Sequence, residues 1–206
     1  MCASQRTTDS SYPFDRVQKA VHLIRDPYDN IVSRFHHEVR NGDTKRQEFG
    51  AEAFRAYCQQ DKNSVHKRSA VETFLSKYQT SKFQDIPCLD EFVKYALWHN
   101  HAFETSATLG LDTMTVHYGW YATAFQATKN KILAFLGLKE DEESPVEHPF
   151  VTGKVYSEYF TEQERKGVKS ILMSIASEET WAEIRQYFAS VEAEDPLSRT
   201  SSKAAL

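Results

Sequence analysis

The sequence predicts a helix-rich α/β domain in which helices flank a parallel sheet. A compact apolar run at 20–24 is typical of a short buried strand, and a helical pattern of apolar residues follows it at once. A second strand-like stretch at 113–118 is likewise followed by a helical pattern that ends at Gly137. Two strand-to-helix units separated by further helices favour parallel strands, because a parallel pair needs a long crossover connection.

Length and composition are those of one domain. The 206 residues are 40% apolar and 13% aromatic, which is enough for a sizeable core. We expect the domain to cover residues 19–190, after a disordered or truncated start at 1–18 and before a flexible tail at 191–206. The formal net charge of −4 gives no general attraction to nucleic acid or to an anionic membrane, so a bound anion must be held by a local pocket.

The first unit has clear signals at its boundaries. The predicted strand Ala20–Ile24 ends at Arg25. Asp26 can then cap a helix, and Pro27 suits the first helical position. The helix places four apolar residues on one face: Ile31, Val32, Phe35 and Val39.

The rest of the chain is predicted to be mainly helical. Mixed, charged residues at 47–81 indicate one or two surface helices. After Pro87 a helical stripe extends to Gly110 and comprises Leu89, Phe92, Val93, Ala96, Leu97, Asn100 and Phe103. Thr161-x-x-Glu164 is a capping box that opens another helix. A last amphipathic helix carries Trp181, Ile184, Tyr187 and Phe188.

Neither the cysteines nor the histidines follow a recognisable pattern for a disulfide framework or a metal site. Cys2, Cys58 and Cys88 are an odd number without a C-x-x-C spacing, so we expect ordinary free thiols. His99 and His101 lack the i, i+4 spacing of a helical metal site, as do the adjacent histidines at 36–37, and no metal is predicted. No apolar run reaches the roughly 18 residues of a membrane span, and the polar start of the chain does not resemble a secretion signal.

Arg25 and Ser33 are the residues most typical of a binding site. An arginine at the carboxyl end of a strand, beside a helix N-terminus, offers a bidentate fork and exposed amides to a phosphate. Ser33 lies eight residues on, two helical turns along, and can add a hydroxyl. The residues alone leave an alternative open, in which the Arg-Asp-Pro turn only starts a helix and Arg25 pairs with Asp29.

The same segment resembles the 3′-phosphate-binding motif of the sulfotransferase superfamily. In that motif a strand ends in R-[DN]-P, and a serine eight residues after the arginine completes the site, as Arg25 and Ser33 do here. The resemblance implies a partial P-loop NTPase-like fold. It also implies that Arg25 and Ser33 hold the 3′-phosphate of the sulfate donor, 3′-phosphoadenosine 5′-phosphosulfate.

Further segments resemble the family in the same order along the chain: Trp98-His-Asn-His101, Val116-His-Tyr118 and Ile132-Leu-Ala-Phe-Leu-Gly-Leu138. Tyr118 lies where a family tyrosine approaches the adenine. Gly119-Trp120 replaces the usual Glu-Asp after it, and the other interpretation of Tyr118 is an ordinary half-buried strand tyrosine.

A basic loop near the C-terminus closes the donor site in the family. The matching loop is Gly153-Lys154-Val-Tyr156, and the resemblance makes Lys154 the candidate for a second phosphate contact. Arg165-Lys166-Gly167 is similar to a triplet of cytosolic members, but it lies inside the capped helix, where we expect a solvated face.

Two family elements have no counterpart in the sequence. The loop that cradles the 5′-phosphosulfate, often P-K-x-G-T-[ST], precedes the arginine motif in the family, whereas only 24 residues precede Arg25 and all seven glycines lie at or after Gly42. The general base of the family also precedes that motif, so no catalytic base can be named. We therefore expect either a fragment of a longer enzyme or a shortened homologue without catalysis.

The resemblance implies transfer of a sulfuryl group from the donor to a hydroxyl or amine, for example of a carbohydrate. The alternatives are a catalytically inactive homologue that binds a nucleotide or a partner, and a helical interaction module. The sequence leaves the compartment open between the Golgi lumen and the cytoplasm.

Overall fold

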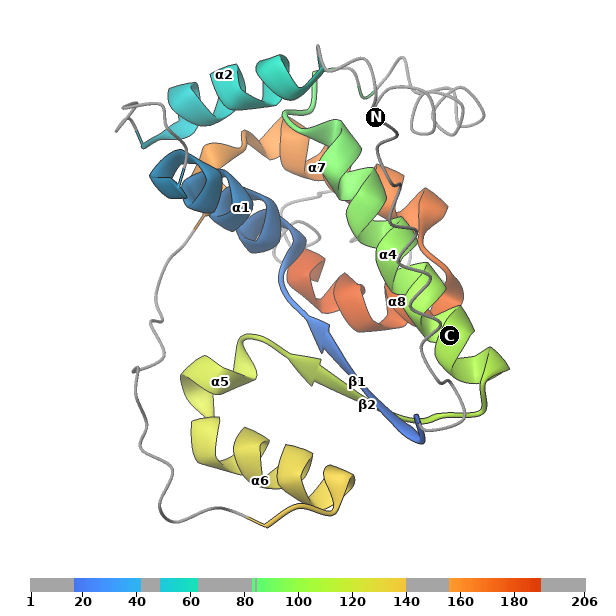
Figure 1. Ribbon diagram of the computed structural model, residues 1–206. Helices are drawn as coiled ribbons and strands as arrows, with labels where there is room; N and C mark the ends of the chain where they lie inside the picture. Colours follow the sequence, from blue (N-terminus) through green and yellow to red (C-terminus); the bar gives the residue numbers. More distant parts are fainter. Residues whose placement is uncertain (1–16, 42–48, 63–82, 84, 140–155, 190–206) are drawn as a thin grey trace, which may run out of the picture.

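The computed structural model describes residues 17–41, 49–62, 83, 85–139 and 156–189. Strands β1 (Lys19–Ile24) and β2 (Asp112–His117) form a parallel pair, in register from Lys19 opposite Asp112 to Ile24 opposite His117. Both predicted strands are confirmed, each with boundaries one residue earlier or later than expected. The carboxyl ends of the two strands therefore lie side by side (Figure 1).

Helix α1 (Pro27–Asn41) begins as its sequence predicts. The Asp26 carboxylate accepts hydrogen bonds from the backbone amides of Tyr28, at 2.8 Å, and Asp29, at 3.3 Å. These bonds satisfy two of the amides that a helix start leaves without a partner. The predicted apolar face is buried at Ile31, Val32 and Phe35.

Most helices gather on one side of the sheet, where the core lies (Figure 1). They are α1, α2 (Ala51–Lys62), α4 (Leu89–Thr108), α7 (Glu162–Ile175) and α8 (Glu178–Ile184). A group of completely or almost completely buried side chains fills the space between them: Phe35, Phe54, Phe92, Val93, Ile171, Leu172, Ile184 and Phe188. Asn100 also joins α4 to the α7–α8 connection, because its side chain bonds the Ile175 carbonyl and the Ser177 amide.

Two details of the helices differ from the prediction. A short helix, α5 (Trp120–Thr123), precedes α6 (Phe125–Leu136), because Ala124 leaves helical geometry with φ −147° and ψ 49°. The last amphipathic segment divides into α8 and the 3₁₀ helix η4 (Arg185–Phe188), which tightens its final turn. The predicted end of α6 is confirmed, since Gly137 has φ 72°, in the left-handed region that glycine tolerates.

The capping box that opens α7 is confirmed in both directions. The Thr161 hydroxyl accepts from the Glu164 amide at 3.2 Å, and the Glu164 carboxylate accepts from the Thr161 amide at 2.7 Å. The expected solvated face is present at Lys166, which pairs with Glu162. Gly167 is different, because a side chain there would meet Ile86 at 2.8 Å.

The prediction of free thiols at two of the cysteines was wrong. Cys58 of α2 and Cys88, the residue before α4, form a disulfide, with Cα atoms 4.7 Å apart. The two residues are 30 positions apart, so their proximity comes from the packing of α2 and α4 and is invisible to a count of spacings. Cys2 lies outside the described residues.

Candidate functional site

The carboxyl ends of β1 and β2 bring together two residues that the sequence singled out. Arg25 directly follows β1, and Tyr118 directly follows β2. The Tyr118 amide donates to the Ile24 carbonyl at 2.7 Å, which continues the strand pairing by one residue. The Arg25 guanidinium carbon lies 4.6 Å from the centre of the Tyr118 ring, in cation–π contact. In α/β sheets this edge is where ligands bind.

A hydrogen bond holds the backbone of Arg25, whereas one nitrogen of its side chain has no hydrogen-bond partner among the described residues. The Tyr95 hydroxyl of α4 donates to the Arg25 carbonyl at 2.7 Å. The Arg25 Nε is buried and has no hydrogen-bond acceptor within the described part of the chain. A buried donor without an acceptor is costly, so this geometry fits the binding of an anionic ligand. Within the same residues no ion pair joins Arg25 to Asp29, the alternative considered from sequence.

Ser33 is half-buried on α1, two turns beyond its start. It shares one helix face with Asp29 and His36, four residues before and three residues after it. Ser33 and Arg25, both among the described residues, are not joined by a hydrogen bond. Lys154, the other candidate for a phosphate contact, lies outside the described residues.

The segment after Lys154 packs along the face of α1 that carries Ser33. Tyr156 is only 5% exposed, and its hydroxyl lies 3.2 Å from His36 Nδ1. The hydroxyl of Tyr159, in the 3₁₀ helix η3 (Ser157–Tyr159), lies 3.0 Å from His36 Nε2. The Tyr156 amide also donates to the Asp29 carboxylate. From the sequence, His36 was considered only as one of two adjacent histidines and Tyr156 only as the end of the basic loop, and their pairing depends on tertiary contacts that no spacing encodes.

Two carboxyl groups at the start of α1 have raised pKa values. Burial and, to a smaller extent, the negative charge of Asp29 raise the pKa of Asp26 to about 7. The amide hydrogen bonds and the charge of Arg25 act in the opposite direction. Burial likewise raises the pKa of Asp29, against the lowering effect of Arg25. Protonation of these groups reduces the negative charge beside the Arg25 guanidinium.

A second histidine anchors the end of β2, and sequence reasoning missed it. His117 Nε2 lies 3.0 Å from a Glu183 carboxylate oxygen, and Nδ1 lies 2.8 Å from the Tyr187 hydroxyl. Adjacent residues of a strand point to opposite faces of the sheet, yet both Val116 and His117 are buried. Helices therefore cover β2 on both faces at this end, which fixes the backbone before Tyr118.

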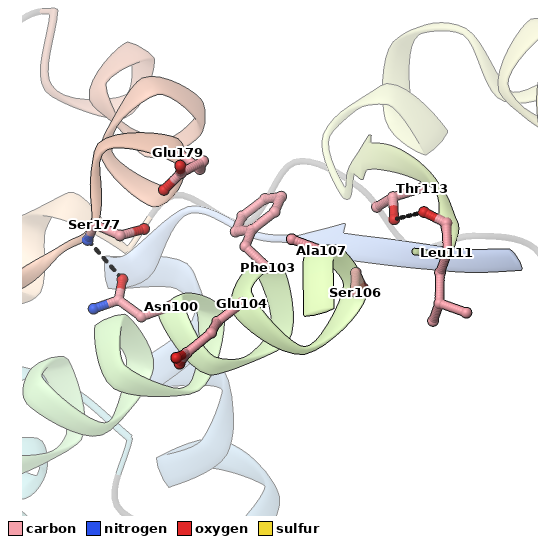
Figure 2. Close-up of a pocket in the computed structure, with 9 residues that line it drawn as sticks. All are labelled: Asn100, Phe103, Glu104, Ser106, Ala107, Leu111, Thr113, Ser177 and Glu179. Carbon is pink, nitrogen blue, oxygen red and sulfur yellow. Dashed lines mark hydrogen bonds between the residues drawn. The ribbon is translucent and has the colours of Figure 1, made fainter. Parts of the chain in front are cut away.

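A cavity of about 630 Å³ lies away from this site, beside the amino end of β2 (Figure 2). Its lining includes Ser106, whose hydroxyl is 3.0 Å from His22 Nε2. In a serine–histidine–aspartate triad a third group orients the histidine, whereas His22 Nδ1 has no partner in the part of the chain that the structure describes. We therefore interpret the contact between Ser106 and His22 as a structural hydrogen bond that joins α4 to β1.

The described residues contain neither a cluster of side chains suited to bind a metal ion nor a helix suited to span a membrane. No group of three or more His, Cys, Asp or Glu side chains in them is arranged to hold a metal ion. None of the helices in those ranges combines the length and the apolar character that crossing a bilayer requires.

Comparison with protein families identifies the family of this domain. A model of the sulfotransferase domain matches residues 10–189. The chain belongs to the sulfotransferase domain family. Comparisons with curated proteins and with solved structures gave no match. The fold is a helix-rich, P-loop-like α/β arrangement with a small parallel sheet, and the family supports a sulfotransferase-like activity in general.

Proposed function

We propose that the carboxyl edge of the sheet in this sulfotransferase domain binds the 3′-phosphoadenosine part of 3′-phosphoadenosine 5′-phosphosulfate. The observation that carries the proposal is the Arg25 guanidinium, which lies on the Tyr118 ring with a buried Nε that has no acceptor among the described residues. A phosphate oxygen supplies that acceptor, and a guanidinium fork binds two oxygens at once.

Each proposed site residue has a distinct role. Arg25 binds the 3′-phosphate, and the Ser33 hydroxyl donates a further hydrogen bond from α1. The Tyr118 ring offers its surface to the adenine, while Arg25 keeps the ring in place through the cation–π contact. Lys154 adds a mobile positive charge from the loop before Tyr156.

The electrostatics of the α1 start favour this ligand in spite of two nearby acidic groups. An ionised Asp26 and Asp29 would repel a phosphate, but burial raises the pKa of both carboxyl groups. Each proton that they retain lowers the repulsion, and the N-terminal end of the helix dipole adds a partial positive charge.

The overall reaction that follows is transfer of a sulfuryl group from the bound donor to a hydroxyl or amine of the acceptor, for example of a carbohydrate. The bond between sulfur and the bridging phosphate oxygen breaks, a bond between sulfur and the acceptor oxygen or nitrogen forms, the acceptor releases a proton to solvent, and 3′-phosphoadenosine 5′-phosphate leaves. We assign no catalytic base. A homologue that binds the nucleotide without transferring sulfate would share the Arg25 site, and activity measurements with the donor separate the two.

Calorimetric titration with 3′-phosphoadenosine 5′-phosphate tests the donor site. Arg25→Ala should weaken binding about 10- to 100-fold, because a charge-assisted phosphate contact contributes about 1.5 to 3 kcal/mol. Arg185→Ala is the matched control, since Arg185 is exposed on η4, and it should bind like the unmodified protein. Absence of binding by the unmodified protein would refute the donor site, and equal binding by Arg25→Ala would refute the role of that arginine.

A further inference from the structure

Tyr156 packs on α1 beside the helical turns that carry Ser33, the serine of the phosphate motif. Its amide donates to Asp29, and its hydroxyl contacts His36 seven residues further along the helix. Ser33 lies between these two positions on the same helix face. The backbone and the side chain of Tyr156 therefore span the stretch of α1 that carries Ser33.

His36 is held between two tyrosine hydroxyls. Tyr159 contacts Nε2 at 3.0 Å and Tyr156 contacts Nδ1 at 3.2 Å. Both tyrosine rings also meet the imidazole edge to face, with centroids 5.0 Å away for Tyr156 and 5.7 Å away for Tyr159. These contacts fix the plane of the imidazole as well as its two polar atoms.

The direction of the hydrogen bonds around His36 determines whether the Tyr156 hydroxyl has a proton to donate to a ligand. A neutral imidazole donates from one nitrogen and accepts at the other. Burial raises the pKa of Tyr156 and of Tyr159, so both hydroxyls keep their protons. If Tyr159 donates to Nε2, then Nδ1–H donates to the Tyr156 oxygen, and the Tyr156 proton is left to donate elsewhere.

The charges around Tyr156 favour an anionic acceptor for its hydroxyl. Arg25 and Arg40 lie close enough for their positive charges to lower the pKa of Tyr156 against the larger effect of burial. The Tyr118 hydroxyl and the Asp29 carboxylate are also within range and act in the opposite direction. A hydroxyl donor that lies in the field of two guanidinium groups suits a phosphate anion.

We propose that Tyr156 is a further residue of the 3′-phosphate site, that its hydroxyl donates to a phosphate oxygen, and that His36 is the positioning residue that directs this proton. The proposal rests on the proposed donor site. Tyr159 then donates to His36, His36 donates to Tyr156, and Tyr156 donates to the phosphate oxygen. Polarised chains of this kind strengthen the final hydrogen bond.

The test combines calorimetry with ³¹P NMR of 3′-phosphoadenosine 5′-phosphate bound to the full chain. Tyr156→Phe keeps the ring and removes the donor, and it should weaken binding about tenfold. At saturating nucleotide it should shift the resonance of the 3′-phosphate and leave that of the 5′-phosphate in place. His36→Phe keeps the ring contacts and should shift the same resonance, with a loss of affinity of about three- to tenfold.

Tyr57→Phe is the matched control, because the Tyr57 hydroxyl contacts the Glu38 carboxylate at 2.7 Å on an exposed part of the surface. It should change neither the affinity nor the spectrum. If the unmodified protein binds and Arg25→Ala does not, but Tyr156→Phe and His36→Phe behave like the control, this inference is wrong and the donor site stands. Equal shifts of both phosphate resonances would also overturn it, since they indicate a general rearrangement. If the unmodified protein does not bind, the donor site itself is wrong.

Discussion

At the scale of single residues, Asp26 combines two properties that oppose each other. As the cap of α1 it accepts hydrogen bonds from the Tyr28 and Asp29 amides, which favour the ionised carboxylate. Its burial favours the neutral carboxyl and is the larger effect, so the pKa rises to about 7. The folded protein therefore retains a proton on Asp26 over a pH range in which the unfolded chain releases it.

We expect Asp26→Asn to change the pH dependence of stability. From its ordinary pKa of 3.8 up to about 7, the folded wild-type protein binds more protons at this position than the unfolded chain, so Asp26 lowers the free energy of unfolding as pH rises. Asparagine caps a helix about as well but does not titrate. The variant should gain stability relative to wild type between pH 4 and pH 7.5, as measured by urea unfolding.

Other groups titrate in the same range, and those that do not interact with Asp26 cancel in this comparison. Burial lowers the pKa of His99 to about 4, so His99 raises the free energy of unfolding as pH rises in both proteins. Asp29 also has a raised pKa and acts in the same direction as Asp26, but its charge interacts with that of Asp26, so Asp26→Asn removes this repulsion and the measured difference belongs to the pair. Parallel stability profiles of the two proteins would show that Asp26 keeps an ordinary pKa.

The sequence predicted part of the candidate site. Arg25 and Tyr118 each end a strand, and strand ends are recognisable locally, so the contact between these residues followed once the strands were parallel. His36 and Tyr156 are 120 positions apart, and their hydrogen bond follows from the packing of the segment before α7 on α1. Local patterns carry no information on such a contact.

At the scale of elements, the helix boundaries with chemical signals were the predictable ones. Asp26, Thr161 and Gly137 mark a start or an end through a specific hydrogen bond or backbone conformation, and all three were confirmed. Helix α5 and the change from α8 to η4 were missed, because no side chain caps the start of α5, α6 or η4 and the sequence therefore carries no chemical signal at these boundaries.

Thr161→Ala should lower the free energy of unfolding by about 1 kcal/mol, the usual cost of removing a helix cap. The cost arises because the Glu164 amide loses its acceptor and one half of the capping box disappears. Thr161→Ser keeps the hydroxyl and is the control, which should remain within about 0.5 kcal/mol of wild type. Chemical unfolding measures both, and equal stability of the alanine and serine variants would contradict the prediction.

At the scale of the whole molecule, the disulfide between Cys58 and Cys88 connects two helices that pack on the same core. Phe54 of α2 and Phe92 of α4 are both fully buried, and each lies one helical turn from its cysteine. Cys88 itself has φ 51°, a left-handed conformation that a cysteine adopts at a cost. The disulfide and the core therefore fix the start of α4 together.

Replacing both bonded cysteines by serine should lower the free energy of unfolding by about 2 to 4 kcal/mol, because the unfolded chain regains the freedom of a closed loop. The loop joins residues 30 positions apart. Cys2→Ser is the control and should leave stability unchanged. A double variant as stable as wild type in denaturant titrations would contradict the expectation.

The same bond has a consequence for where the protein can work. Disulfides last in oxidising surroundings such as the secretory pathway, whereas the glutathione and thioredoxin systems of the cytoplasm reduce them. Of the two compartments that the sequence left open, the Golgi lumen is the one in which the Cys58–Cys88 bond persists. A preparation made in a reducing host should contain the weaker, reduced form, so donor binding is best measured on protein that has been secreted.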